Sequence, residues 1–309
     1  MNEENVRSLL FKDDKAVIYD MKDEYKKLLD IGESDTNIIK WEKYEKYKHY
    51  NAANEKDSID CDVCELAVYI YHKSWRFLKE RKVNANRPTK QYKINPYEER
   101  NHKYQLVINH DKEKEYYRGD TMTSFKNTYN HYKKHFVSNE KIKEQIEKFA
   151  KLYHTIGNMI PVPSYFNTVR SGNFARYDFW DLTMLQIKKW YKYADDEQLK
   201  HLLNPEGNNN KEKISLDLCK KWLNYFTGWN DFVEKNYLQN FIQLVEGDEL
   251  LKDEDGGYIP LVFWTNHSYE NFNLPSEPEI FYEYLKILND AIEKRNEAIL
   301  LELYNTLKY

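Results

Sequence analysis

The sequence predicts a mainly α-helical globular domain with minor β structure, in which one or two short hairpins accompany a set of helices. Hydrophobic residues make up 41% and aromatic residues 16% of the 309 positions, which is enough for a substantial core. Apolar residues recur at intervals of three and four in several segments, as in amphipathic helices. The segment KYQLVINHDKEKEYY at 103–117 instead favours a short hairpin with its turn at NHDK.

We expect residues 1–309 to form one large helical domain, because the sequence contains no internal repeat and no low-complexity linker. The segment NPEGNNNKEK at 204–213 has the composition of a flexible loop, so a soft division of the domain is expected there. Residues 86–101 contain two prolines and are predicted to form another loop.

Two helices are predicted in the first half of the chain. Residues 63–82 have helical apolar spacing and end in basic residues. A second helix is expected to begin at Ser138, its predicted N-cap, and to end near the pair Gly157–Asn158. The chain is then expected to return as a loop through Pro161 and Pro163.

The second half of the chain is predicted to be largely helical. A helix over 177–193 carries apolar residues on nearly every face, which places it in the core. Residues 215–241 are predicted to form one or two helices divided at Gly228. A turn at 255–257 and a short strand are expected next, before a long amphipathic helix capped by Ser276.

The composition favours a cytoplasmic protein without a membrane segment. No stretch approaches about 18 consecutive apolar residues, and the first residues lack the apolar run of a signal peptide. The chain has three cysteines, a number that agrees with a reducing compartment. Cys61 and Cys64 form a CxxC, but the helical pattern after them favours buried thiols over a zinc or redox site.

Charge is distributed unevenly along the chain. Residues 118–193 carry 13 basic and 6 acidic side chains, whereas residues 194–309 carry 11 basic and 22 acidic ones. A basic segment is where a phosphate-bearing partner is expected to bind. Alternatively, the basic and acidic segments face each other within the fold. The sequence leaves both interpretations open.

Polar groups suited to chemistry concentrate in the stretch YHTIGNMIPVPSYFNTVRSG at 153–172 and just after it. A histidine transfers protons near neutral pH, arginines hold phosphate, and two aspartates at i,i+3 position a histidine or bind a metal. The candidate catalytic residues are His154, Asp178 and Asp181, and the candidate substrate-binding residues are Asn158, Asn167, Arg170 and Arg176.

Each of these residues also has a structural interpretation that the sequence leaves open. A histidine at the edge of an apolar stripe, such as His154, is often simply hydrogen-bonded within the fold. Asn158 follows a predicted helix and is suited to cap its end. Arg176 and Asp178 are suited to a local ion pair.

A second candidate segment, YRGDTMTSFKNTY at 117–129, adds a glycine turn, a carboxylate and hydroxyls. The substrate-binding candidates in it are Arg118, Asp120, Thr121 and Ser124. The pattern lacks the glycines, lysine and hydroxyl of a phosphate-binding P-loop. As the alternative, Asp120 or Thr121 caps a helix that runs to His135.

Two further patterns are weaker. His131 and His135 have the i,i+4 spacing of metal ligands, but HYKKH lacks the glutamate of the metalloprotease motif. The segment KDEDGGY at 252–258 contains acidic residues and glycines, but it lacks the final glutamate of a calcium loop and is predicted to be a turn.

The stretch 153–172, with RGDTMTSF before it and DFWDLTMLQIKKWY after it, resembles a family of uncharacterised bacterial and phage-associated proteins. It also resembles the second half of His-Asn-His endonuclease domains over about 20 residues, at Ile156-Gly157-Asn158, Asn167 and Arg170. The upstream Asp-His and proline of those endonucleases have no counterpart, since INHDKEKE departs from that pattern.

These observations favour an enzyme acting on a phosphodiester or nucleotide, a nuclease or nucleotide hydrolase, in phage–host conflict or antiviral defence. Its cleft is expected between residues 153–181 and residues 118–124. The cofactor is left open, and a divalent metal ion is one candidate. The alternative is a noncatalytic protein that binds a nucleotide signal, nucleic acid or an acidic protein partner. A third interpretation makes 153–172 a structural elbow in a protein that acts through contacts of its long helices.

Overall fold

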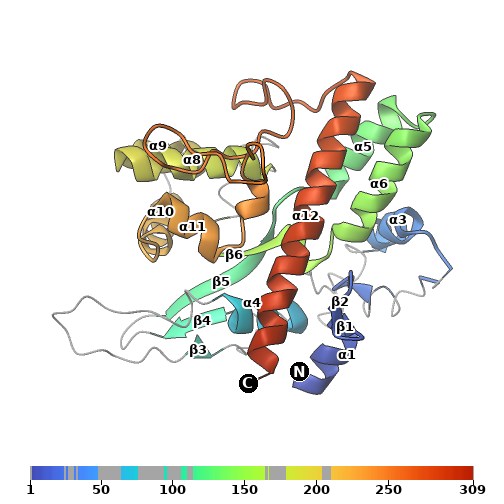
Figure 1. The fold of residues 1–309 in the computed structure, drawn as a ribbon, viewed down its shortest axis with the longest axis horizontal. Helices are drawn as coiled ribbons and strands as arrows, with labels where there is room; N and C mark the ends of the chain where they lie inside the picture. Colours follow the sequence, from blue (N-terminus) through green and yellow to red (C-terminus); the bar gives the residue numbers. More distant parts are fainter. Residues whose placement is uncertain are drawn as a thin grey trace.

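The computed structural model describes residues 2–23, 26, 31, 32, 34–47, 64–75, 94, 95, 106–109, 114–163, 166, 179–203 and 210–308. Helices dominate this part of the chain (Figure 1), which confirms the predicted mainly α fold with minor β structure. The helices are α1 (Glu3–Leu10), α3 (Asn37–Tyr47), α4 (Glu65–Ser74), α5 (Phe125–His135), α6 (Glu140–Leu152), α8 (Trp180–Tyr193), α9 (Asp196–Leu203), α10 (Asn210–Leu223), α11 (Trp229–Lys235) and α12 (Pro278–Leu307), with short 3-10 helices η3 (Ile156–Asn158) and η4 (Gln239–Phe241).

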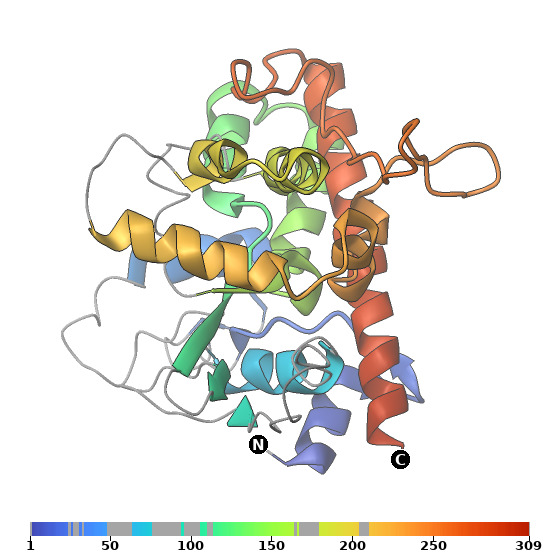
Figure 2. The same ribbon diagram turned by 90° about the vertical axis from the view of Figure 1, so that its left-hand side faces the viewer.

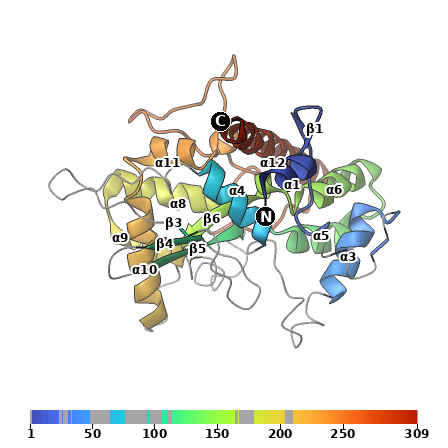
Figure 3. The same cartoon turned by 90° about the horizontal axis from the view of Figure 1, so that it is seen from below.

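A four-stranded antiparallel sheet lies between two groups of helices. Its order is β3-β4-β5-β6, and a separate hairpin pairs β1 with β2. Helix α10 contacts β6 and α4 contacts β4 and β5, while α8 to α11 lie at the left of the molecule and α3, α5 and α6 at its right (Figures 1 and 3). The strands are β1 (Phe11–Lys12), β2 (Lys15–Ala16), β3 (Ile94–Asn95), β4 (Leu106–Asn109), β5 (Lys114–Thr121) and β6 (Met159–Pro163).

The sheet confirms the predicted hairpin and corrects two predicted loops. Asn109 pairs with Lys114, so β4 and β5 flank the expected turn. Residues 94–95 were expected in a loop, yet they pair with β4. The stretch 159–163 is also a strand, in which Pro161 lies opposite Gly119. Strand β6 pairs only with β5 in the described part of the chain, and such an edge strand tolerates prolines that lack an N–H to donate.

The long helix α12 organises the core. It runs the height of the molecule beside α6 (Figures 1 and 2) and also contacts α4, η3 and η4. Its apolar face buries large side chains along its length, including Tyr284, Leu288 and Ile299. Each buried side chain of this size contributes about 1.5–3 kcal/mol to folding. Pro278 occupies the first turn, where its missing N–H costs nothing.

Several helix boundaries differ from the prediction because caps form elsewhere. Asn139, not Ser138, caps α6, since its Oδ1 accepts a hydrogen bond from the backbone N–H of Ile142 at 3.2 Å. Glu277, not Ser276, precedes α12. The predicted division at Gly228 is confirmed by the break between α10 and α11.

Core contacts connect the helices that flank the predicted loop at 204–213. Trp222 in α10 packs against Phe166 with ring centroids 5.4 Å apart, and α9 contacts α10. Helix α10 begins at Asn210, inside the predicted loop, and residues 204–209 lie outside the described residues. The organisation as one domain stays a prediction. Among the described helices, none has both the length and the apolar character needed to cross a membrane.

Candidate functional site

The predicted catalytic residue His154 lies in a buried ionic cluster at the end of α6. Its Nδ1 is 3.6 Å from Oδ1 of Asp20 and 3.4 Å from Nζ of Lys26, which is itself ion-paired with Asp20. The rings of Tyr153 and Tyr44 enclose the imidazole, at centroid distances of 4.3 and 5.2 Å. Only 2% of His154 is exposed, so the side chain is enclosed by protein.

The environment of His154 favours its neutral form. Burial, followed by the positive charge of Lys26, lowers the pKa of His154 to about 4, although Asp20 acts in the opposite direction. Burial also raises the pKa of Asp20, but interactions with His154 and Lys26 outweigh it and hold that pKa well below its usual range. The imidazole is therefore neutral and not in its imidazolium form near pH 7, and it ties the segment around Asp20 to the elbow.

The turn after His154 is fixed against α12. A Cβ added to Gly157 would lie 2.3 Å from the backbone oxygen of Ile292, so only glycine fits this approach. Arg295 is fully buried, and its guanidinium donates to the carbonyls of Gly157 and Met159, both at 2.7 Å, and of Asn236 at 3.1 Å. Burial lowers the pKa of Arg295 to about 9. These contacts hold η3 and the residue that follows it firmly against α12.

The side chain of Asn158 forms hydrogen bonds with backbone groups around it. Its Oδ1 accepts a hydrogen bond from the N–H of Thr123 at 3.2 Å, and its Nδ2 donates to the carbonyls of Thr123 and Tyr153 at 3.2 and 3.0 Å. The side chain is fully buried. Asn158 therefore joins the end of β5 to the elbow, and its side-chain donor and acceptor are both engaged there.

The candidates in 118–124 lie on β5 and just after it. Asp120 is buried, and its Oδ2 accepts a hydrogen bond from the indole N–H of Trp180 at 3.4 Å. Arg118 is exposed on the same strand, and Thr121 is half-buried at its end. Neither Asp120 nor Thr121 caps α5, because Ser124 occupies the N-cap position.

Four predicted site residues cannot be compared with the prediction because they lie outside the described residues. They are Asn167, Arg170, Arg176 and Asp178. Within the described part, His154 and Asp181 have separate partners, and no hydrogen bond or ion pair joins them. The predicted convergence of histidine, arginine and aspartate stays a prediction.

Asp181 positions a histidine that the sequence did not single out. Its Oδ2 lies 2.5 Å from Nδ1 of His267 and accepts a hydrogen bond from the N–H of Phe263 at 3.2 Å. The His267 ring stacks on Trp264 with centroids 3.5 Å apart. Asp181 Oδ1 and His267 Nε2 are buried, and neither atom has a hydrogen-bond partner among the described residues. One polar atom of each side chain therefore remains unsatisfied.

The sequence offers little signal for His267. It stands in the polar segment WTNHSYENFN, where no apolar period places it against a helix. The contact with Asp181 joins positions 86 residues apart, so only the tertiary fold reveals it.

Two lysines on α8 share a helical face with Asp181. They follow it by seven and eleven residues, which are close to two and three full turns. Lys188 Nζ lies 2.7 Å from Oδ2 of Asp253 and donates to the carbonyl of Gly257 at 3.3 Å, while Lys192 pairs with Asp255. The segment 253–267 therefore contacts this face of α8 from Lys192 to Asp181.

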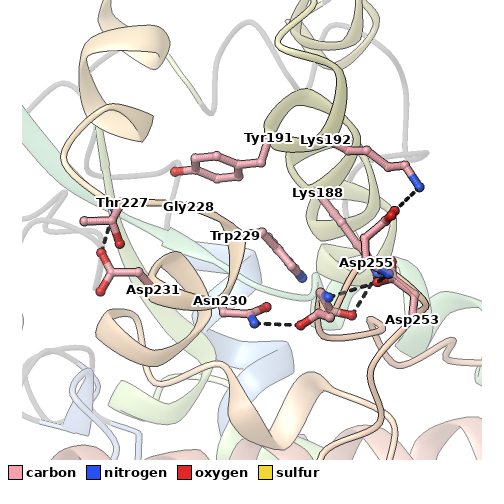
Figure 4. A pocket seen from close by; sticks show the side chains of 12 residues that line it. Lys188, Tyr191, Lys192, Thr227, Gly228, Trp229, Asn230, Asp231, Asp253 and Asp255 are labelled. Carbon is pink, nitrogen blue, oxygen red and sulfur yellow. Dashed lines mark hydrogen bonds and ion pairs between the residues drawn. The ribbon is translucent and has the colours of Figure 1, made fainter.

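A pocket of about 580 Å³ opens beside these lysines (Figure 4). We call it the α8 pocket; its lining residues are Lys188, Tyr191, Lys192, Thr227–Asp231, Asp253 and Asp255–Gly257. Among the described residues, apart from each glycine and its two chain neighbours, no atom lies within 4 Å of the position that a Cβ would take on Gly228 or Gly256. A ligand can therefore approach the backbone closely at both glycines.

Hydrogen bonds hold the turn that forms one wall of the α8 pocket. Asp253 Oδ1 accepts from the N–H groups of Asp255 and Gly257 at 3.1 and 2.9 Å, which confirms the predicted turn. Asn230 Nδ2 donates to the carbonyl of Gly256 at 2.9 Å, and Trp229 Nε1 donates to that of Tyr258 at 2.7 Å. The strand predicted after the turn is reduced to isolated bridges, such as Lys252 with Tyr258.

Several ion pairs join the basic segment 118–193 to the acidic segment 194–309. Lys148 contacts Asp290 at 3.2 Å and Glu293 at 2.8 Å, in addition to the two lysine pairs of the α8 pocket. At these points, lysines of the basic segment are neutralised by carboxylates of the acidic segment within the fold.

The weaker metal and cysteine patterns have structural partners. Among the described residues, no three histidine, cysteine, aspartate or glutamate side chains gather in a way that could hold a metal ion. His131 Nε2 lies 2.8 Å from the carbonyl of Pro275. Cys64 is buried and caps α4, where its Sγ accepts from the N–H of Ala67 at 3.3 Å. Cys61 lies outside the described residues.

The sequence profile of a family of unknown function (DUF6994) matches residues 45–299, so the chain belongs to this family. No curated protein and no solved structure matches the chain. The family agrees with the resemblance to uncharacterised proteins noted in the sequence. The phage association and the resemblance to His-Asn-His endonucleases stay predictions.

Proposed function

We propose that this member of the DUF6994 family binds a phosphate-bearing small molecule of nucleotide size in the α8 pocket. The observation that carries the proposal is the pair Lys188 and Lys192, one helical turn apart at the edge of an open pocket. Its volume of about 580 Å³ falls within the roughly 300–1,000 Å³ typical of small-molecule sites.

The lining of the α8 pocket suits the two parts of a nucleotide. Two ammonium groups on one helix face provide donors for phosphate oxygens. Tyr191 and Trp229 provide an aromatic wall, a surface on which nucleobases bind. The Tyr191 hydroxyl donates to the carbonyl of Leu223 at 2.6 Å, which fixes the ring in place.

Asp253 and Asp255 form ion pairs with Lys188 and Lys192 when no ligand is bound. Lys188 holds the pKa of Asp253 below its usual value, so this carboxylate is charged at neutral pH. Ion pairs at this level of exposure contribute about 0–1 kcal/mol each. A polyphosphate, which carries more charge than the two carboxylates, can therefore replace them at modest cost.

The structure gives less support to the other functions that the sequence predicts. His154 is neutral and enclosed, so an enzyme that uses it as general acid has no described route to substrate. Lys133 pairs with Glu42 at 3.1 Å and Lys143 with Glu140 at 3.3 Å, much as Lys188 and Lys192 pair with aspartates, but of these four lysines only Lys188 and Lys192 line the α8 pocket. We therefore favour a small phosphate ligand at the α8 pocket.

Binding is tested by titrating ATP and GTP, each with and without Mg²⁺, into the purified protein by isothermal calorimetry. We expect at least one of these nucleotides to bind the wild type. Replacing one charged donor removes about 1.5–3 kcal/mol, so Lys188→Gln should weaken binding roughly 10- to 100-fold.

Lys189→Gln is the matched control, because Lys189 is exposed on the same helix but faces away from the α8 pocket. It should bind like the wild type. Absence of binding by the wild type at millimolar nucleotide, or equal losses in both variants, would contradict the proposal.

A further inference from the structure

We propose that the protein forms a homodimer through a groove between the β1–β2 hairpin and α12, with a second copy of the chain as the partner. The groove is lined by residues between 11 and 16 of the hairpin and between 294 and 304 of α12, and we call it the α12 groove. It shares no lining residue with the α8 pocket, so the inference is independent of ligand binding there.

One stripe of α12 forms the first wall of the α12 groove. Lys294, Glu297, Ala298, Leu301 and Tyr304 line it, at intervals of three and four residues on successive turns. Residues at this spacing lie on one face of a helix. The volume of the groove is about 620 Å³, so it is large enough to receive side chains of another molecule.

The β1–β2 hairpin forms the second wall (Figures 1 and 3). Its turn residues Asp13 and Asp14 have positive φ of 49° and 60°, as a tight two-residue hairpin turn requires. The ring of Phe11 packs against Tyr304 of α12 with centroids 5.2 Å apart, which holds the hairpin against the helix. The α12 groove therefore lies between two regular elements that contact each other.

Apolar side chains form a continuous patch at the α12 groove. Phe11, Ala16, Ala298, Leu301 and Tyr304 supply the apolar part of its lining. Leu301 is 61% exposed. A single exposed leucine on a protein surface needs no explanation, but a leucine that continues the apolar lining of a groove indicates a contact with another molecule.

The charged residues of the α12 groove are balanced in sign. Asp14 and Lys15 line it from the hairpin, and Lys294 and Glu297 line it from α12. Among the described residues, none of these four side chains has an ion-pair or hydrogen-bond partner. A partner of one charge sign would gain from two of them and be repelled by the other two. A second copy instead brings two carboxylates and two ammonium groups, which match this set.

The same surface also contains both parts of an apolar contact. In a twofold dimer one patch serves both subunits, so it must be complementary to itself. The exposed Leu301 of each protomer can enter the α12 groove of the other, while lysines of one copy face carboxylates of the other. Stable dimers bury about 1,200–2,000 Å² in total, and one groove is a small part of that area, so we expect a dimer with a micromolar Kd.

Sedimentation velocity of the full chain, from the low micromolar to the low millimolar range, measures this equilibrium. The wild type should change from monomer to dimer across the range. Leu301→Asp should raise the dimer Kd roughly 10- to 100-fold, because the burial of the leucine is lost. Val137→Asp is the matched control, since Val137 is 62% exposed and does not line the α12 groove. It should dimerise like the wild type, and circular dichroism checks that both variants fold.

Inverted charges test whether the partner surface is the same groove. In the acidic variant, Lys15→Glu with Lys294→Glu, all four charged residues of the α12 groove are negative. In the basic variant, Asp14→Lys with Glu297→Lys, all four are positive. Each variant alone should stay monomeric, because like charges face each other. An equimolar mixture should form dimers again, since every charge then faces its opposite.

Two controls separate a specific contact from general attraction between charged proteins. Lys141→Glu with Lys151→Glu makes the same change of charge on α6, outside the α12 groove, and should dimerise like the wild type. Adding Leu301→Asp to both members of the mixture should weaken its dimer, because the apolar contact is lost while the charges remain.

A wild type that stays monomeric throughout the concentration range overturns the inference. A dimer whose Kd is unchanged in folded Leu301→Asp also overturns it, because the contact then lies on another surface. A mixture of the acidic and basic variants that stays monomeric shows that the α12 groove does not face a second copy of itself, and it contradicts the inference as well.

Discussion

Polar side chains gather in two regions, the described part of the elbow at 153–163 and the face of α8 that bears Asp181, Lys188 and Lys192. The two regions differ in the partners of these side chains. In the elbow, Asn158 forms hydrogen bonds with backbone groups of Thr123. Arg295 of α12 donates to the elbow carbonyls of Gly157 and Met159. At α8, the lysines border a pocket of about 580 Å³, and within the described part of the chain neither Asp181 Oδ1 nor the neighbouring His267 Nε2 has a hydrogen-bond partner.

We propose that this difference separates polar groups that build the fold from polar groups that are available to a ligand. The elbow is the more conspicuous segment in the sequence, because glycine, prolines, histidine and asparagine crowd together there. Buried polar groups must be satisfied, however, and in the elbow backbone groups and side chains such as Arg295 satisfy them. The face of α8 is less conspicuous in the sequence and has the greater unused capacity for hydrogen bonding.

The largest effect is expected for Arg295→Met. The substitution keeps much of the side-chain volume but leaves the buried carbonyls of Gly157, Met159 and Asn236 without their donor. Removing one member of such a buried charged network costs about 3–5 kcal/mol. Urea unfolding followed by circular dichroism measures the loss. Lys294→Met, an exposed neighbour on α12, should change stability by less than about 0.5 kcal/mol.

Gly157→Ala is expected to have the next largest effect. The added methyl would meet the backbone of Ile292 and Asn296 at less than 3 Å, so η3 must move away from α12. Overpacking of this kind costs about 1–3 kcal/mol. Gly228→Ala is the control, because its Cβ meets no atom within 4 Å and its φ of 167° is extended. Equal melting temperatures for the two variants would show that the elbow is not fixed against α12.

A smaller and pH-dependent effect is expected from His154. Its pKa is about 4 in the folded protein and near 6.5 in the unfolded chain, so the unfolded state binds the proton more readily. Stability is therefore fully present above about pH 6.5 and is lost as the pH falls toward 4, by an amount on the order of 2–3 kcal/mol.

Urea unfolding between pH 4 and pH 8 checks this dependence. His154→Gln should flatten the part of the profile between pH 6.5 and 4, whereas His135→Gln should retain it. The depressed pKa of Asp20 acts in the same direction at still lower pH, since its carboxylate must be protonated as the protein unfolds in acid. An unchanged profile in His154→Gln would contradict the buried, neutral state of this histidine.

The substitution Lys188→Gln should have the smallest effect on stability. Lys188 forms a partly exposed ion pair with Asp253, and such pairs contribute about 0–1 kcal/mol. Thermal unfolding without ligand checks this expectation. A loss comparable to that of Arg295→Met would place Lys188 among the residues that build the fold and would weaken the contrast between the two regions.

The elements that local pattern controls could be predicted from the sequence. Apolar periodicity predicted the main helices, the turn sequence NHDK predicted the hairpin of β4 and β5, and Gly228 predicted the break between α10 and α11. Strand β6 was missed because two prolines suggest a loop, whereas an edge position removes the need for their N–H groups. The N-cap of α6 was displaced by one residue because Asn139 competes with Ser138 for the same role.

The candidate site was predictable only in part, since its geometry depends on contacts distant in sequence. Asp181 was identified as a residue that positions a histidine or a metal, but its histidine neighbour is His267, 86 positions away. The α8 pocket is lined by residues of α8, α11 and the turn at 253–257, and no local sequence pattern predicts that these three segments lie together. His154 and Asn158 stood out in the local sequence, and their contacts join the elbow to segments that are distant in the chain, around Asp20 and Thr123.

We propose that the α8 face, and not the elbow, retains its polar groups for a ligand. Calorimetric titration of ATP and GTP with Mg²⁺ at pH 7.5 into wild type, Lys188→Gln and His154→Gln tests it most directly. We predict binding to wild type and His154→Gln with equal Kd, and at least a 10-fold weaker Kd for Lys188→Gln. Binding that is lost in folded His154→Gln but retained in Lys188→Gln would place the site at the elbow and contradict the account.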